Sequence, residues 1–243
     1  MTNEKKLNII MGKNAVTEAI KGGRTIHTIY LTEVLKQSDF AKFCEANTAV
    51  KYVAPKFLQI YGDKHGGVVA EVKEYTTVPL SQVIQKNQNK ENVALIMLDG
   101  LEDPHNLGAI LRTADATGMD AIIIPKHRSV KLNATVAKVS TGAIEYVDVA
   151  EVVNLSQTID VLKKAGYWVI GLEADGTVYY NQQDYSGKIV VVLGSEGKGI
   201  SRLVKEKCDF LVKIPMHGHI TSLNVSVSAA LIFYEIVRNR GIK

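Results

Sequence analysis

The chain has 243 residues, of which 46% are hydrophobic and 22% charged. This composition is typical of an ordinary globular protein, and the length allows one large domain or one medium and one small domain. No apolar run approaches the ~20 residues that span a bilayer, and the opening MTNEKK lacks the apolar core of a signal peptide. Only two cysteines are present, Cys44 and Cys208. This disfavours a disulfide framework and predicts a cytoplasmic protein without a membrane partner.

The net charge of +4 is unevenly distributed along the chain. Residues 1–92 hold 13 Lys and Arg against nine Asp and Glu, whereas residues 93–243 hold 16 of each sign. A basic N-terminal part on a neutral body suits contact with a polyanion such as RNA. A Lys-rich solvated surface would carry the same excess, so charge alone leaves both interpretations open.

Short helical and extended patterns alternate in the N-terminal part. We expect helices over residues 14–19 and 39–46, and strands over 28–31 and 68–72, the last after a Gly66-Gly67 turn. The polar stretch 76–92 then predicts a linker with one short helix near 80–85. The expected organisation is a small domain over 1–75, a linker over 76–92 and a second domain over 93–243.

Apolar, β-branched runs recur in the second domain. They cover residues 93–98, 121–124, 147–149, 168–172, 189–193 and 210–214. Most are separated by segments with helical spacing, and this alternation predicts an α/β fold with a parallel sheet covered on both faces. The last helix is expected to begin near Ser222, which is a good N-cap residue, and to stop at Gly241.

Three polar segments lie at or near the ends of apolar runs. They are residues 103–114 (DPHNLGAILRTA), 193–199 (LGSEGKG) and 214–225 (IPMHGHITSLNV). In a parallel α/β sheet, ligands bind outside the carboxyl ends of the strands. Residues 99–100, 173, 194–199 and 215–218 all follow strands, so we expect them to share one edge of the sheet.

Known nucleotide and metal signatures do not fit these segments. Val192 stands where a Walker loop needs its first glycine, and no Gly-x-Gly-x-x-Gly follows the first strand, which disfavours a nicotinamide-dependent oxidoreductase. His217 and His219 resemble a His-x-His pair but have no further ligand at convincing spacing, so no metal site is expected. Cys208 has no evident base partner and is expected in the core.

Two charged residues stand out within the polar segments. The Arg112 guanidinium is suited to binding a phosphate with two hydrogen bonds, although a surface Arg paired with Asp115 three residues on would look the same. Glu196 lies inside the glycine-rich turn, where it either serves a ligand or only stabilises the turn.

The three segments together resemble the SpoU branch (SpoU/TrmH) of the SPOUT methyltransferases, which methylate a ribose 2′-hydroxyl of RNA. The family motif Asn-x-Gly-x-x-x-Arg matches at Asn106, Gly108 and Arg112, and Leu-Gly-x-Glu-Gly matches at residues 193–197. The third motif matches at residues 214–216 and 222–226. These matches cover about 150 residues in the family's order.

The resemblance implies S-adenosyl-L-methionine as cofactor, a deep trefoil knot in the C-terminal domain and a homodimer. The knot is an exception to the rule against threaded chains. The residues that it implies for cofactor binding are Gly194, Ile214 and Leu223, with Leu172 and Met216 lining the pocket.

The N-terminal part resembles the small ribosomal-protein-like RNA-binding domain of one subgroup. The matching segments are residues 11–19 (MGKNAVTEA) and 65–70 (HGGVVA). Residues 128–140 (RSVKLNATVAKVS) also resemble sequences of this subgroup. That subgroup includes the bacterial enzymes that methylate a guanosine of 23S ribosomal RNA. A tRNA ribose and the rRNA target of thiostrepton-resistance enzymes stay open as alternatives, as does a non-catalytic RNA-binding or ribosome-assembly factor; DNA is not an expected partner.

The catalytic role implied for Arg112 is to bind the phosphate of the target nucleotide near its 2′-hydroxyl. A guanidinium with a pKa above ~12 is a poor base, so the residue that removes the proton stays open. Asn106, Glu196, Ser222 and Asn224 are expected to orient the ribose or Arg112.

Overall fold

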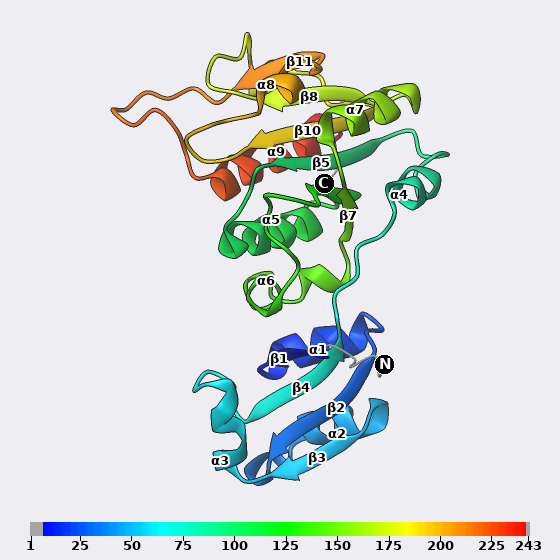
Figure 1. Cartoon of the computed structure of the whole chain (residues 1–243), viewed down its shortest axis with the longest axis vertical. Helices are drawn as coiled ribbons and strands as arrows, with labels where there is room; N and C mark the ends of the chain where they lie inside the picture. The colour runs from blue at the N-terminus through cyan, green and yellow to red at the C-terminus, as the bar shows by residue number, and fades with distance from the viewer. Residues whose placement is uncertain (1–6, 242–243) are drawn as a thin grey trace. The chain divides into compact units, whose positions relative to one another are not determined.

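The computed structural model describes residues 7–241 and divides them into two compact units (Figure 1). The first unit comprises the described residues up to Thr76 together with Leu132–Tyr146, and the second comprises Thr77–Lys131 and the described residues from Val147 onward. The opening MTNEKK, on which the signal-peptide expectation rests, lies outside the described residues. Within residues 7–241, no helix has the length and apolar character needed to cross a membrane.

The first unit is built on a four-stranded sheet of order β1-β4-β2-β3, in which β2 and β3 are parallel and the other pairs antiparallel. Its strands are β1 (Leu7–Met11), β2 (Ile26–Thr32), β3 (Val50–Val53) and β4 (Val68–Lys73); its helices are α1 (Lys13–Lys21), α2 (Asp39–Asn47), α3 (Pro55–Leu58) and α6 (Ala134–Val139). Short 3₁₀ turns lie at Glu33–Leu35, Gln59–Tyr61 and Ala143–Glu145. The predicted helices and strands of this region are confirmed, whereas the short elements β1, β3 and α3 carried too little pattern to be predicted.

A buried ion pair holds the segment Leu132–Tyr146 to the rest of the first unit. Arg24 Nη1 lies 3.1 Å from Glu145 Oε1, and the two side chains are only 6% and 9% exposed. The Arg24 guanidinium also lies 3.3 Å from the centre of the Tyr75 ring. Burial raises the pKa of the Glu145 carboxyl, and the charge of Arg24 opposes that rise.

The second unit contains a seven-stranded sheet of order β7-β6-β5-β10-β8-β11-β9, and every neighbouring pair is parallel. The strands are β5 (Val93–Asp99), β6 (Ala121–Pro125), β7 (Asp148–Val152), β8 (Trp168–Leu172), β9 (Val178–Tyr179), β10 (Lys188–Gly194) and β11 (Phe210–Lys213). The predicted parallel α/β sheet is confirmed. Strand β9 was not predicted, because two residues leave no periodic pattern.

Helices cover both faces of this sheet (Figure 1). They are α4 (Leu80–Lys86), α5 (Pro104–Ala116), α7 (Leu155–Lys164), α8 (Arg202–Lys205) and α9 (Val225–Asn239), with a 3₁₀ turn at Tyr180–Gln182. On one face, Leu95, Met97 and Val190 pack with Ile159 of α7 and residues of α4 and α8. On the other face, α5 and α9 pack against each other. Burial on both sides explains why the strand sequences are almost continuously apolar.

The structure confirms the helix predicted near residues 80–85 but shifts the start of the last helix. Helix α4 confirms the short helix expected within residues 76–92. The last helix, however, begins at Val225 rather than near Ser222, so the expectation that Ser222 caps it is wrong. Asn224 is the cap instead: its Oδ1 accepts a hydrogen bond from the Ser226 backbone N–H at 2.8 Å.

Candidate active site

A cavity of about 890 Å³ opens at the carboxyl ends of β8, β10 and β11. Three loops form its wall: the residues after β8, the glycine-rich turn 194–199 after β10, and the segment 213–223 between β11 and α9. The sequence predicted that these segments share one edge of the sheet, and the structure confirms this.

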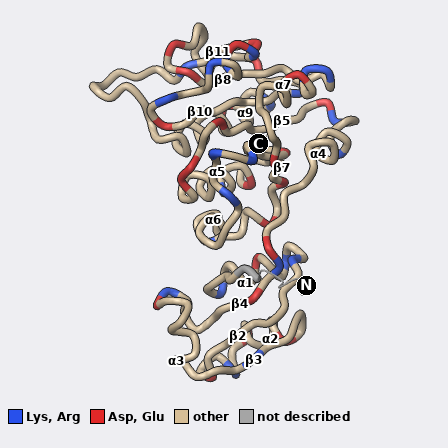
Figure 2. The backbone as a smooth tube through the Cα atoms, viewed as in Figure 1, with Lys and Arg blue, Asp and Glu red and all other residues tan. Residues whose placement is uncertain are grey.

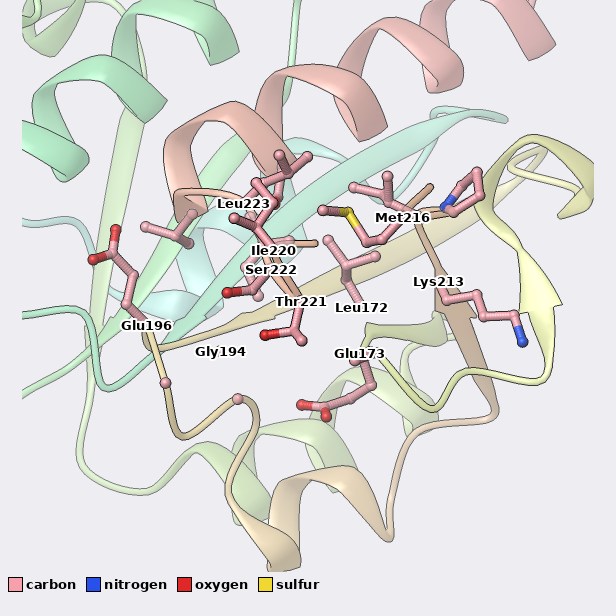
Figure 3. Close-up of a pocket in the computed structure, with 18 of the residues that line it drawn as sticks. Leu172, Glu173, Gly194, Glu196, Lys213, Met216, Ile220, Thr221, Ser222 and Leu223 are labelled. Carbon is pink, nitrogen blue, oxygen red and sulfur yellow. The ribbon is translucent and has the colours of Figure 1, made fainter. Parts of the chain in front are cut away.

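The five residues expected to bind the cofactor all line this cavity. They are Leu172, Gly194, Ile214, Met216 and Leu223. Leu172, Met216, Leu223 and Glu173 are labelled among the lining side chains in Figure 3, where the Glu173 carboxylate is drawn below the other three. The cavity therefore combines apolar side chains with exposed backbone from the glycine-rich turn.

The turn after β10 is tight enough to require glycine. A Cβ at Gly194 would lie 2.0 Å from the carbonyl carbon of Gly199. The backbones of Ser195 and Gly199 exchange hydrogen bonds of 3.2 and 3.0 Å, and Gly197 and Gly199 have φ of +81° and +65°. The chain thus folds back on itself here and presents its backbone to the cavity.

Glu173, at the end of β8, anchors this turn. Its Oε1 accepts a hydrogen bond of 2.5 Å from the backbone N–H of Ile200, and its Oε2 lies 3.6 Å from Lys205 Nζ. The carboxylate also occupies the space that a Cβ at Gly199 would enter. Glu173 therefore fixes the far end of the turn from a neighbouring strand.

One residue from each of the three motifs meets in a hydrogen-bond network. Asn106 Nδ2 donates to Glu196 Oε1 at 3.0 Å. Asn224 Nδ2 donates to the same Glu196 oxygen at 2.7 Å and to Asn106 Oδ1 at 3.0 Å. Residues separated by as many as 118 positions in sequence are thus joined. The two amides hold the Glu196 carboxylate in one orientation.

Asn224 has two roles in this arrangement. Its Oδ1 caps helix α9, while its Nδ2 belongs to the network with Glu196. The start of the helix and the position of the carboxylate are therefore coupled through one side chain. Ser222, two residues earlier, is exposed and lines the cavity without a capping role.

Arg112 is not brought to this cavity. It lies on the exposed side of α5, whereas Asn106 on the same helix is buried. Among residues 7–241, it makes no hydrogen bond or ion pair through its guanidinium. The structure therefore separates Arg112 from the other candidate catalytic residues of its own chain.

The two histidines and Cys208, which the sequence analysis also considered, lie outside the hydrogen-bond network. His217 and His219 line the cavity, and within the described part of the chain no group of three or more His, Cys, Asp or Glu is placed to hold a metal ion. Cys208 packs against the core below α7, as predicted, and burial raises the pKa of its thiol to about 12.

Two cavity residues were missed by the sequence reasoning. Lys213, the last residue of β11, has its Nζ 5.2 Å from the centre of the Tyr179 ring in β9. The pairing of β9 with β11 places Tyr179 there, and β9 has no signal of its own in the sequence. Lys213 could have been found, because it directly precedes the third motif at the end of a predicted strand.

Fold and site together define a parallel α/β protein with a ligand cavity at the carboxyl ends of its strands, and comparisons with known proteins identify its family. The chain belongs to the SpoU rRNA methylase family, whose model matches residues 94–234. A second model, for the substrate-binding domain of RNA 2′-O ribose methyltransferases, matches residues 9–78.

The full-length relatives carry the same description. The chain is 48% identical to a protein of Staphylococcus haemolyticus named as a TrmH family tRNA/rRNA methyltransferase, over 96% of each chain. It superposes with a TM-score of 0.84 and 24% identity on AviRb, a SpoU methyltransferase of Streptomyces viridochromogenes crystallised with AdoMet, covering 97% of this chain and 91% of that one. A crystal structure of an RNA 2′-O ribose methyltransferase gives a TM-score of 0.81 and 25% identity, over 99% and 91%. The predicted family is therefore confirmed, and the protein is an RNA methyltransferase of it.

Proposed function

We propose that this protein transfers a methyl group from S-adenosylmethionine to the ribose 2′-hydroxyl of a guanosine in 23S ribosomal RNA. The observation that carries the proposal is the network of Asn106, Glu196 and Asn224 at the rim of an apolar, glycine-rich cavity. Family membership supports the chemistry. The resemblance of the N-terminal segments to the 23S rRNA subgroup supports the target.

The residues of the cavity fit S-adenosylmethionine. Leu172, Ile214 and Leu223 offer apolar surface for an adenine ring, and the backbone of turn 194–199 offers hydrogen bonds for its polar edges. A Cβ at Gly218 would meet nothing within 4 Å, so the backbone is also open to a ligand there. A volume of about 890 Å³ lies within the range of small-molecule sites.

The reaction joins the ribose oxygen to the methyl carbon while the carbon–sulfur bond breaks, leaving a neutral thioether and releasing the hydroxyl proton. When bound, S-adenosylmethionine supplies the electrophilic carbon. The protein's contribution is alignment, which in model reactions supplies up to ~7–11 kcal/mol. Both amides bind Oε1 of Glu196, so we assign Oε2 to accept a hydrogen bond from the 2′-hydroxyl. Ser222, exposed at the same cavity, completes the polar rim.

Arg112 is proposed to bind one of the two phosphates that flank the target nucleotide, from the exposed side of α5. A planar guanidinium holds a phosphate with two hydrogen bonds, which Lys cannot reproduce. Arg112→Lys is therefore expected to lower the single-turnover rate at least tenfold while S-adenosylmethionine affinity stays unchanged. A near-normal rate for Arg112→Lys contradicts this assignment.

The first unit is proposed to hold the surrounding RNA. We assign residues 1–75 to an RNA-binding domain and 93–243 to the methyltransferase domain, of which the segment Leu132–Tyr146 packs in the first unit. Lys and Arg occur along both units, interspersed with Asp and Glu (Figure 2). Binding through scattered phosphate contacts predicts an affinity that falls steeply with salt, by a slope of about 0.7 per contact for single-stranded RNA.

The protein is also proposed to act as a homodimer through α9. Val227 and Tyr234 on this helix are 48% and 59% exposed, and Leu231 between them is half-buried. A continuous apolar stripe on a helix surface marks an interface. Tyr234→Glu should yield monomers by light scattering, whereas Val161→Glu, which places the same charge on exposed apolar surface of α7, should leave dimers. Dimers in both variants, or monomeric wild type, refute the proposal.

The experiment that tests the proposed function incubates the protein with tritiated S-adenosylmethionine and either unmethylated 23S rRNA or bulk tRNA, and then maps ribose methylation. Label at one guanosine of the rRNA is the expected result, and Glu196→Gln is expected to abolish most of it. Label only in tRNA keeps the chemistry and overturns the target; the name shared by the relatives covers both RNAs. Cofactor binding without transfer to either RNA favours a non-catalytic RNA-binding protein.

A further inference from the structure

A second cavity, of about 770 Å³, lies beside the first at the same edge of the sheet. It opens at the carboxyl ends of β7, β6, β5 and β10, whereas the first cavity opens at those of β10, β8 and β11. The two cavities share only the turn after β10, where Ser195, Glu196, Lys198 and Gly199 line both. That turn is therefore a wall between them, and Asn106 lines the second side.

We infer that this second cavity binds the acceptor nucleotide of a single-stranded RNA segment, with one of its phosphates at Arg128 and Lys198. The inference rests on the proposed function, because it places the methyl donor in the first cavity. Donor and acceptor then meet at Glu196, the side chain that the network holds in place and that lines both cavities.

The cations of this cavity are available to a ligand. Arg128 and Lys198 are exposed, and neither guanidinium nor ammonium makes a hydrogen bond or ion pair with another residue in the range 7–241. Arg128 also has φ of +55°, a left-handed conformation that is uncommon for a residue with a side chain and that concentrates at functional sites. Two positive groups without a partner at the edge of a cavity suit a phosphate.

Four carboxylates, those of Asp99, Glu102, Asp103 and Glu196, line the cavity together with these cations. Helices α5 and α7 both begin at its wall, capped by Asp103 and Asn154, and their N-terminal N–H groups favour an anion. Asp103 accepts the His105 backbone N–H at 2.9 Å, and Asp99 accepts that of Ser201 at 2.8 Å. Two of the carboxylates thus have structural roles and are partly neutralised by the donors that they accept.

The cavity also offers apolar surface for a base. Val153 is 78% exposed and Leu203 is 57% exposed, and both lie in its wall. These aliphatic side chains give the flat faces of an unstacked base apolar surface to contact, beside cations for its phosphate. A volume of about 770 Å³ is adequate for one nucleotide.

Two variants with different chemistry test the inference. Arg128→Gln removes the charge but keeps the stem, and Leu203→Trp narrows the cavity from an exposed position on α8. Removing one charged hydrogen bond to phosphate should raise KM for 23S rRNA roughly tenfold or more, and the salt slope of RNA binding should fall by about 0.7. Leu203→Trp should raise KM for RNA by a similar factor. In both, S-adenosylmethionine affinity by calorimetry should stay within about twofold of wild type.

The matched control is Lys164→Gln, which removes the same charge from the exposed C-terminal end of α7, away from both cavities. It should leave KM for RNA unchanged. Wild-type KM in both Arg128→Gln and Leu203→Trp overturns the inference. If the wild-type protein labels no RNA, the proposed function fails, and binding of unmethylated 23S rRNA then tests the second cavity separately. Weaker RNA binding by Arg128→Gln but not by Lys164→Gln supports the inference. Equal RNA binding by the two variants overturns it.

Discussion

Substitutions at Asn224 can separate the two roles of its side chain, which caps helix α9 and holds the Glu196 carboxylate. Its Oδ1 caps α9 through a 2.8 Å bond to Ser226 N, and its Nδ2 donates 2.7 Å to Glu196 and 3.0 Å to Asn106. Asn224→Ser keeps a good capping oxygen but loses both donors. Asn224→Ala loses the cap as well. Asn224→Asp keeps the cap and places a second carboxylate against Glu196.

The cap sets the expected stability of the second unit. Replacing a capping Ser, Asp or Asn by Ala costs about 1 kcal/mol, within a range of ~0.5–2. Asn224→Ser should therefore unfold within ~0.5 kcal/mol of wild type, and Asn224→Ala about 1 kcal/mol below it. In Asn224→Asp the capping gain is opposed by carboxylate repulsion, which in this exposed position is limited to ~1 kcal/mol.

The network sets the expected activity. Loss of the donors frees the Glu196 carboxylate, and a tenfold fall in rate corresponds to about 1.4 kcal/mol of transition-state stabilisation. Asn224→Ser, Asn224→Asp and Asn224→Ala should thus all lose at least tenfold in single-turnover methyl transfer, whatever their stability. Urea denaturation followed by fluorescence and transfer of tritium to RNA measure the two quantities separately. The reasoning is refuted if Asn224→Ser is fully active, or if it is as unstable as Asn224→Ala.

Two substitutions and one measurement of thiol reactivity test structural roles elsewhere in the chain. Gly194→Ala should destabilise the second unit by about 3 kcal/mol or more and abolish cofactor binding, because its Cβ would lie 2.0 Å from the carbonyl carbon of Gly199; calorimetry and urea denaturation measure both effects. Arg24→Met should cost the first unit about 3–5 kcal/mol at pH 7 by leaving Glu145 buried without its partner, and less near pH 4, as measured by urea denaturation at the two pH values. The Cys208 thiol should react with Ellman's reagent at pH 8 roughly a thousandfold more slowly than a free thiol, because burial raises its pKa to about 12.

The sign of the second expectation follows from the direction of the shift. Burial raises the pKa of the folded Glu145 carboxyl above its unfolded value, so the first unit loses stability as pH rises through the interval between the two values. Removing Arg24 takes away the opposing charge and widens that interval. An Arg24→Met penalty that is equal at pH 4 and pH 7 contradicts this account.

The predictions for Gly194→Ala and for the Cys208 thiol have their own controls. Gly218→Ala places a methyl group in open space at an ordinary φ and should change stability by less than ~0.5 kcal/mol. If it is as damaging as Gly194→Ala, the close approach of the turn is not the cause. A Cys208 thiol that reacts within minutes in the folded protein shows that the packing around it is open.

The parts of the fold that the sequence predicted are those in which burial dictates the residues. Strands β5, β8 and β10 are buried on both faces, so their sequences are apolar without interruption and their limits were predicted within a residue or two. Strand β9 pairs only at the edge of the sheet over two residues, and no local pattern marks it. The start of α9 was misplaced by three residues because Ser222 and Asn224 are both good caps, and the network with Glu196 decides between them.

Contacts between residues far apart in the chain could not be predicted from the sequence. Arg24 and Glu145 are 121 positions apart, and nothing near either residue indicates that the segment Leu132–Tyr146 packs in the first unit. The five residues proposed to bind the cofactor were predicted from the family resemblance, and all five line one cavity. The second cavity shares Asn106 and Glu196 with the motifs, but the rest of its wall comes mostly from residues after β5, β6 and β7, which have no shared pattern in the sequence.

The glycines of the turn after β10 bear on the proposal that the two cavities serve one reaction. A Walker loop was excluded because the spacing is wrong, yet glycine is still required at positions 194, 197 and 199 by close packing or positive φ. Without side chains at these three positions the turn stays narrow. In the proposed reaction the methyl carbon and the ribose oxygen meet past the edge of the turn, beside Glu196, because backbone atoms would separate reactants on its two faces. The side chain that the turn does carry at its edge, Glu196, is held by amides from α5 and from the start of α9. The three motifs are far apart in sequence because they belong to different elements. Asn106 lies on α5, Glu196 in the turn after β10, and Asn224 at the start of α9.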